Sequence, residues 1–233
     1  MAEPLDTPKG ISPWMDDFDR AAIDTTNIWT TNSDAGGTAF AINSQTGGVA
    51  RGGVDTTDND ITNLFGHKVF RLDESPATVE IRAKPVTSVA DGETFIGLTD
   101  AITSDETPIT LSAADVQTNT ATDAVGFAYT GAGTADWKMV AVNNGSTPTG
   151  SPTRCNVRGA TTPVVGTWQT FKLALSNEGH ARFWLNGVEQ GSLASAVRAT
   201  VLLNVGIAVQ SGGTARSLDV DYVEIRHGRR MTA

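Results

Sequence analysis

The sequence predicts an all-β protein in which two antiparallel sheets stack face to face. Twenty-four glycines and nine prolines among 233 residues indicate many short strands joined by tight turns, and no helical stripe of apolar residues persists beyond about two turns. A hydrophobic content of 39% over this length is enough to bury one sizeable core, and β-sandwiches of this size often form one domain. We expect that domain at residues 14–227, between an extended, proline-rich N-terminal arm (1–13) and a basic C-terminal tail (228–233).

The segment from Trp168 to Gly187, WQTFKLALSNEGHARFWLNG, predicts a hairpin together with its register. A three-residue loop at 177–179, with Gly179 supplying a positive φ, aligns the two strands. The apolar face then pairs Phe171 with Leu185, Leu173 with Phe183 and Leu175 with Ala181, and the other face pairs Lys172 with Trp184, Ala174 with Arg182 and Thr170 with Asn186. One apolar face and one mixed face are typical of a sheet that is packed on one side.

The other strand candidates are runs of β-branched, aromatic and aliphatic residues bounded by turn residues. Together with the hairpin strands they lie at 14–18, 28–29, 38–42, 64–71, 77–85, 93–98, 124–130, 137–143, 169–175, 181–186, 202–210 and 217–226. About ten to twelve strands suit two stacked six-stranded sheets. Segments 44–60 and 143–163 are rich in Gly, Ser, Thr, Asn and Asp and are expected to be long loops.

Charge, cysteine content and the N-terminus exclude several classes of protein. A formal net charge of −9 argues against a nucleic-acid partner, because affinity for phosphates depends on clustered Lys and Arg. A single cysteine, Cys155, forms no intrachain disulfide, and no recognisable motif supplies the histidine that a cysteine nucleophile needs. The N-terminus lacks the charged and apolar regions of a signal peptide, and no apolar run is long enough to span a membrane. We therefore expect a chain that folds in the cytoplasm, is not Sec-secreted, does not contact membranes and carries no cofactor or metal.

Three parts of the sequence resemble the concanavalin A-like and laminin-G-like jelly rolls. DDFDR with the later Trp29 is similar to their opening strand, the hairpin to their central strands, and VGIAVQ followed by LDVDYVEIR to their closing strands. The resemblance implies a jelly-roll β-sandwich in which the first and last strands lie side by side, pairing the Phe18 region with residues 220–225. This scaffold carries lectins, glucanases, adhesion modules and virion proteins, so the resemblance specifies a fold more than a function.

An enzymatic reading rests on Asp219, Asp221 and Glu224 in DVDYVE, which resemble the E-x-D-x-x-E strand of glucanases. The apolar face changes sides within this strand, and a bulge at Tyr222 and Val223 would bring the three carboxylates together. Asp219 is shorter than the glutamate of the pattern, and the motif lies in the last strand rather than an internal one. Sugar-cleaving clefts also need several stacking aromatics, whereas this chain is only 6% aromatic. We expect no catalytic residues.

A lectin-like reading places glycan contacts on the mixed face of the hairpin, at Trp184, Lys172 and Arg182. The alternative for Trp184 is that it covers a second layer or contacts a subunit. The acidic segment with Asp55, Asp58, Asn59 and Asp60 is a second candidate, acting directly or through calcium. Calcium needs about six or seven converging oxygens, and DTTDND lacks the spacing of a known calcium loop, so a solvated loop is the preferred interpretation.

The reading that the sequence favours is a non-enzymatic structural protein of a phage particle, such as a capsid decoration or a fibre- or tail-associated protein. Jelly rolls of this kind usually act outside cells, and a virion protein reaches the outside by lysis without an export signal. The partners would be other virion proteins, further copies of the chain in lattice contacts and, as an additional ligand, host glycans. Arg226, Arg229 and Arg230 form the dense basic cluster expected to dock on an acidic partner, with a solvated tail as the alternative.

Overall fold

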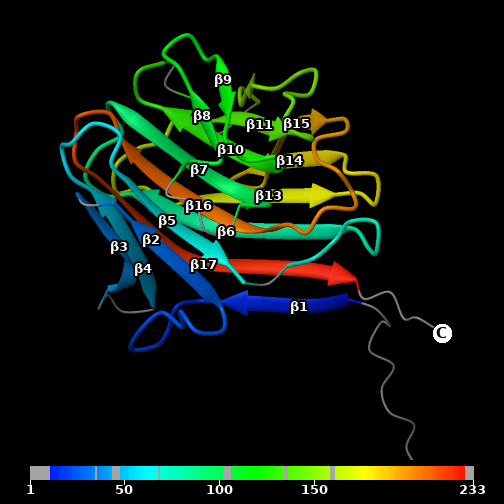
Figure 1. The fold of residues 1–233 in the computed structure, drawn as a ribbon, viewed down its shortest axis with the longest axis horizontal. Helices are drawn as coiled ribbons and strands as arrows, with labels where there is room; N and C mark the ends of the chain where they lie inside the picture. The colour runs from blue at the N-terminus through cyan, green and yellow to red at the C-terminus, as the bar shows by residue number, and fades with distance from the viewer. Residues whose placement is uncertain are drawn as a thin grey trace, which may run out of the picture.

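The protein is a two-sheet antiparallel jelly-roll sandwich, as the sequence predicts (Figure 1). The computed structural model describes residues 11–34, 36–43, 48–67, 69–101, 106–133, 136–157 and 161–228. Within them, an eight-stranded sheet runs in the order β15-β14-β13-β6-β17-β4-β3 with β1 paired to β17, and a seven-stranded sheet runs β12-β11-β10-β7-β16-β5-β2. Strands β8 and β9 form a separate hairpin.

The strands of the eight-stranded sheet are β1 (Ile11–Asp16), β3 (Gly37–Asn43), β4 (Val49–Val54), β6 (Ala77–Pro85), β13 (Gln169–Leu175), β14 (Ala181–Leu185), β15 (Val188–Leu193) and β17 (Arg216–Gly228). Those of the seven-stranded sheet are β2 (Trp29–Ser33), β5 (Ile61–Gly66), β7 (Gly92–Thr99), β10 (Ala124–Thr130), β11 (Lys138–Val142), β12 (Thr153–Arg154) and β16 (Asn204–Ser211). The separate hairpin consists of β8 (Ile109–Leu111) and β9 (Gln117–Asn119).

The main core lies between the two sheets. Along β6 and β13 every second residue is buried, because successive side chains of a strand point to opposite faces. At the centre, the Phe127 ring of the seven-stranded sheet meets the rings of Phe171 and Phe183 edge-on, with centroids 5.3 and 5.5 Å apart. Buried aromatics from both sheets therefore join the two layers.

The central hairpin, β13 and β14, has the register that the sequence predicts. Leu173 pairs with Phe183, and Lys172 pairs with Trp184 on the other face. Gly179 has a φ of 76°, and a Cβ at this position would lie 1.9 Å from the Val197 carbonyl oxygen. Both the backbone conformation and the lack of space require glycine at this turn.

The prediction of a long loop at 44–60 is wrong, because β4 occupies residues 49–54 and lies inside the sheet between β17 and β3. Its sequence, VARGGV, has the glycines of a turn. In the structure, Gly52 allows close packing instead, because a Cβ at this position would lie 2.5 Å from the Phe40 ring on β3. Three other strands also differ from the prediction. Strand β15 follows the hairpin, where no strand was expected, and β12 lies inside the predicted loop 143–163. Strand β5 ends at Gly66 instead of continuing to Arg71.

The first and last strands lie side by side, as the jelly-roll resemblance implies. Trp14 of β1 pairs with Ile225 of β17, and Ile11 pairs with Gly228. Strand β1 therefore includes residues 11–13, which the sequence assigned to the arm, and β17 includes Gly228. The two ends of the described chain are thus adjacent, while Arg229 and Arg230 lie outside the described residues.

Candidate functional site

The two sheets present outer faces of different character, and this difference locates the candidate site. The outer face of the seven-stranded sheet is apolar and packs against Ile109 and Leu111 of the β8–β9 hairpin, which forms a third layer. The outer face of the eight-stranded sheet has polar and charged side chains from β6, β13, β14 and β17. A candidate binding surface is therefore sought on the eight-stranded sheet.

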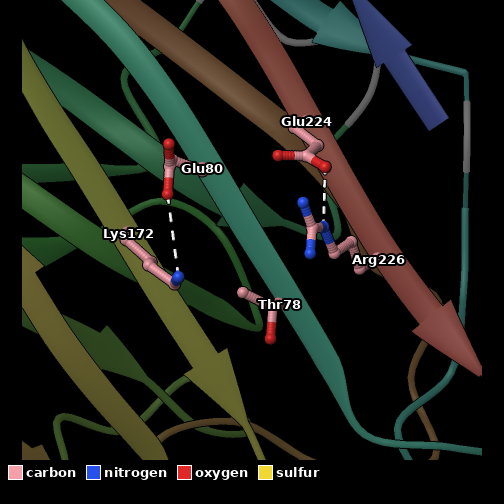
Figure 2. A pocket seen from close by; sticks show the side chains of 5 residues that line it. All are labelled: Thr78, Glu80, Lys172, Glu224 and Arg226. Atoms are coloured by element: carbon pink, nitrogen blue, oxygen red, sulfur yellow. Dashed lines mark hydrogen bonds and ion pairs between the residues drawn. The ribbon is translucent and has the colours of Figure 1, made fainter. Parts of the chain in front are cut away.

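A groove of about 650 Å³ runs across this outer face. It is lined by Glu80, Thr170, Lys172, Trp184, Asn186, Gly187 and Tyr222. A smaller hollow of about 180 Å³ shares Glu80 and Lys172 with the groove and adds Thr78, Glu224 and Arg226 (Figure 2). The two hollows together form one candidate site that spans β14, β13, β6 and β17 in their order across the sheet.

Strand alternation places most of these side chains, and a β-bulge places the rest. On β17 the pairing with β6 shifts between Val220, which faces Ala83, and Tyr222, which faces Arg82, so Asp221 is the additional residue. The bulge keeps Val223 buried and leaves Tyr222 and Glu224 facing outward. The change of apolar face was predicted, but the bulge lies at Asp221 instead of at Tyr222 and Val223.

Two glutamates face each other in the site, each with its own cation. Glu80 and Glu224 are direct cross-strand partners on β6 and β17, an arrangement that like charges disfavour. Lys172 Nζ lies 3.7 Å from Glu80 Oε2, and Arg226 Nε lies 2.6 Å from Glu224 Oε1 (Figure 2). The site therefore combines two negative and two positive groups within a small area.

Tyr222 completes the polar lining as a hydrogen-bond donor. Its hydroxyl donates to Glu80 Oε1 at 2.7 Å. Burial, followed by the bond to Glu80 and the negative charge of that residue, raises the pKa of Tyr222 to about 12. The phenol therefore stays protonated at neutral pH and orients Glu80.

The three carboxylates of the glucanase-like motif do not meet in one pocket. Asp219 is fully buried and accepts two hydrogen bonds from Arg51, at 2.6 and 2.9 Å, with Lys84 Nζ at 3.4 Å. Asp221 Oδ2 lies 2.5 Å from Arg82 Nη1, and only Glu224 of the three lines the candidate site, in its smaller hollow. Each carboxylate is held by a different basic side chain.

The three candidate glycan contacts divide into two groups. Lys172 and Trp184 line the groove, whereas Arg182 lies over the Trp184 ring, 5.1 Å from its centroid, and forms an ion pair with Glu189 at 2.7 Å. Arg182 therefore packs against one face of the Trp184 ring. The Asn186–Gly187 turn that follows, with φ values of 52° and 78°, brings two more lining residues to the groove.

Sequence reasoning did not identify Glu80, Tyr222, Thr170 or Asn186 as site residues. Alternation along 77–85 shows which face of its strand Glu80 occupies, but not that β6 lies between β13 and β17. The strand order of the sheet supplies that information.

The remaining candidates lie in different places. Arg226 belongs to β17 and lines the smaller hollow, ion-paired with Glu224. Cys155 is fully buried, and burial raises the pKa of its thiol to about 12, so little thiolate forms at neutral pH. The part of the chain that the structure describes has no helix long and apolar enough to cross a membrane.

Comparison with known proteins identifies the fold and no more. No protein-family model matches the chain, and no curated protein matches it. Solved structures that match include the carbohydrate recognition domain of Emp47p, with a TM-score of 0.62, 12% identity and coverage of 94% of this chain and 97% of that one. Bacillus licheniformis β-glucanase matches with a TM-score of 0.61, 11% identity and coverage of 96% and 100%. A structure from work on endo-acting O-glycanases of human gut bacteria that initiate mucin breakdown matches with a TM-score of 0.64, 12% identity and coverage of 91% and 97%. The chain thus has the concanavalin A-like jelly-roll fold over nearly its whole length.

Proposed function

We propose that the protein binds carbohydrate, as a lectin-like module, in the groove on the outer face of the eight-stranded sheet. The observation that carries the proposal is the groove of about 650 Å³ in which Trp184 is combined with hydrogen-bonding side chains. Sugars present an apolar face of C–H groups and a rim of hydroxyls, so they suit one aromatic ring among convergent polar groups.

The polar groups of the groove supply both kinds of hydrogen-bonding partner that a sugar requires. The Lys172 ammonium donates to sugar oxygens, and its side chain is 42% exposed. The Glu80 and Glu224 carboxylates accept from sugar hydroxyls, which are donors as well as acceptors. Since the positive and negative groups of the site balance, a neutral glycan fits better than a polyanion.

The structural neighbours support the same proposal. One is described as a carbohydrate recognition domain and another as a β-glucanase, and both names concern polysaccharides or glycans. Their identity to this chain is 12% or less, so what they bind is a guide to the class of ligand and not to a particular sugar.

The proposal includes binding without hydrolysis. It is supported by the burial of Asp219 beneath Arg51 and Lys84 and by the ion pairs of Asp221 and Glu224, since a nucleophile must be accessible to the sugar. We expect no release of reducing sugar from β-glucans, and Glu224→Gln should leave this result unchanged. Hydrolysis by the parent protein that Glu224→Gln abolishes would contradict this part of the proposal.

Glycan-array binding followed by calorimetry with the best ligand tests the site. Trp184→Ala should weaken binding by about tenfold or more, which corresponds to about 1.4 kcal/mol. Trp168→Ala is the matched control, because Trp168 stacks under Arg82 and Lys84, with its ring centroid 4.9 and 4.5 Å from them, and does not line the groove. An array without a bound glycan, or equal losses in the two variants, would contradict the assignment.

The role of a phage virion component, with virion proteins and further copies of the chain as partners, remains a prediction from the sequence. The adjacent ends of the described chain, at Ile11 and Gly228, favour a docking surface at that edge of the sheet. Removing residues 1–10 and 229–233, which include Arg229 and Arg230, should preserve the fold and reduce occupancy on particles lacking the protein. Equal occupancy by full-length and truncated protein would place docking elsewhere.

A further inference from the structure

Two connections between the sheets meet at a corner of the sandwich and contribute no residue to the glycan groove. One joins β2 to β3 and includes Asp34 and Gly36, and the other joins β4 to β5 and includes residues 55–60. The Asp55 amide donates to the Gly36 carbonyl at 3.2 Å, and the Ile61 amide donates to Asp34 Oδ2 at 2.8 Å. These hydrogen bonds hold the two connections together.

Carboxylate oxygens from this corner converge above Gly36. A Cβ on Gly36 would lie 1.6 Å from Asp60 Oδ2 and 2.8 Å from Asp55 Oδ1. The two oxygens therefore occupy the space that any other residue at position 36 would fill. Neither carboxylate can donate a hydrogen bond to the other while both are ionised.

Asp60 is the buried member of this cluster, and one of its carboxylate oxygens lacks a hydrogen-bond partner among the described residues. The residue is only 8% exposed, and its Oδ2 atom is buried without a hydrogen-bond partner. The Oδ1 atom of Asp34 is likewise buried and unpartnered.

Basic side chains of the described residues do not compensate the negative charge of this cluster. The ion pairs formed among the described residues do not include Asp34, Asp55 or Asp60. A buried carboxylate without a counter-charge destabilises the fold. A bound cation would remove this destabilisation.

We propose that Asp55 and Asp60 bind a hydrated divalent cation, with Ca²⁺ the ion expected, and that Asp34 adds negative charge beside it. The described residues contain no complete cage of three or more His, Cys, Asp or Glu ligands, so water fills the remaining positions. Calcium accepts carboxylates, other oxygens and water in irregular arrangements. The Thr57 amide donates to Asp55 Oδ1 at 2.6 Å and holds that carboxylate in the loop.

This proposal replaces the expectation of a metal-free chain with a solvated acidic loop. The sequence pattern DTTDND lacks calcium-loop spacing because it is only half of the site. Asp34 and the space above Gly36 come from a connection about twenty residues earlier in the printed sequence, and folding brings them together. The bound ion would stabilise the corner by linking the β2–β3 and β4–β5 connections.

Titration of the full-length protein, stripped with a chelator, tests the proposal directly. CaCl₂ or MgCl₂ is titrated into the protein in a calorimeter, which measures the heat of binding. The melting temperature is measured separately at several concentrations of each ion. We expect one saturable Ca²⁺ site and a melting temperature that rises with the ion concentration. Asp60→Asn and Asp55→Asn should each weaken Ca²⁺ binding by at least about tenfold. Asp58→Asn is the matched control, because it removes the same charge from an exposed position of the same loop and should bind Ca²⁺ like the parent.

The measurement on the parent protein does not depend on whether any variant folds. Absence of heat and of a melting-temperature change with both ions would overturn the proposal and indicate that Asp55 and Asp60 share a proton instead. An equal loss in Asp58→Asn and Asp60→Asn would also overturn it, because it would indicate diffuse attraction of cations to an acidic surface.

Discussion

On the outer face of the seven-stranded sheet, Phe95 packs against Ile109 and Leu111 of the β8–β9 hairpin, whereas on the outer face of the eight-stranded sheet Trp184 borders an open groove. In both strands successive side chains point to opposite faces, and both aromatics point away from the core between the two sheets. The covering hairpin lies in the connection between β7 and β10 and buries this outer face in a second core (Figure 1).

The comparison shows that alternation alone does not tell which outer face is available to a ligand. The covered face carries an apolar set with Phe95, Val140 and Val142, and the open face carries ion pairs such as those of Glu80 and Glu224. Apolar side chains are stable on a face only where another layer removes them from water. The following changes test this contrast, from the largest expected effect to the smallest.

Replacing an aromatic on each outer face should give very different losses of stability. Phe95→Ala should lower the free energy of unfolding by about 3–5 kcal/mol, because Phe95 is fully buried, and Phe171→Ala and Phe183→Ala in the shared core should cost the same. Trp184→Ala should cost no more than about 1 kcal/mol, as for a surface residue. Urea unfolding measures all four, and an equal loss for Phe95→Ala and Trp184→Ala would show that the two faces do not differ.

The ion pairs of the open face differ in how deeply their carboxylates are buried, and substitutions of two arginines test this difference. Arg51→Ala should cost about 2–3 kcal/mol, because it leaves the fully buried Asp219 with only Lys84 as a counter-charge. Arg182→Ala should cost about 0.5 kcal/mol or less, since the side chains of Arg182 and Glu189 are 59% and 41% exposed. Chemical denaturation measures both variants, and similar costs would mean that Asp219 is solvated.

A partly buried carboxylate, that of Glu93, makes the covered face sensitive to pH. Burial against the β8–β9 hairpin raises the pKa of Glu93 to about 7, and its Oε2 atom has no hydrogen-bond partner. The folded state then holds a proton that the unfolded state loses between about pH 4.5 and 7, so this residue's contribution to stability falls as pH rises through that window. The fall should be on the order of 2 kcal/mol.

Glu93→Gln removes the titrating group and keeps the shape of the side chain. Denaturation of parent and variant at pH 5 and pH 8 should show a smaller loss of stability on going to pH 8 in the variant. Parallel pH profiles would indicate that Glu93 is hydrated in the folded protein.

The smallest expected effect on stability concerns Lys172 and its neighbour on β13. Lys172→Ala should change the free energy of unfolding by about 0.5 kcal/mol or less, because the side chain is partly exposed. Leu173→Ala, which removes a buried side chain, should cost about 2–5 kcal/mol. Lys172→Ala should nevertheless weaken glycan binding, and a full-affinity variant would remove Lys172 from the site.

The sequence was sufficient for features encoded within about twenty consecutive residues. The 168–187 segment predicted its own register because alternating apolar residues and a glycine at 179 leave one arrangement that buries a single face. The change of apolar side between Val220 and Val223 also predicted a bulge to within one residue. The all-β class followed from the same local patterns, and the adjacency of the first and last strands was implied by the jelly-roll resemblance.

Only the tertiary structure decided which distant segments meet. Gly52 resembled a loop residue until its place against Phe40 was known, and Glu80 became a site residue because β6 lies between β13 and β17. The same holds for Asp34 beside Asp60 and for the hairpin that covers the seven-stranded sheet. The physical reason is that alternation and turn chemistry act over a few residues, whereas pairing between strands depends on how all apolar faces are buried together.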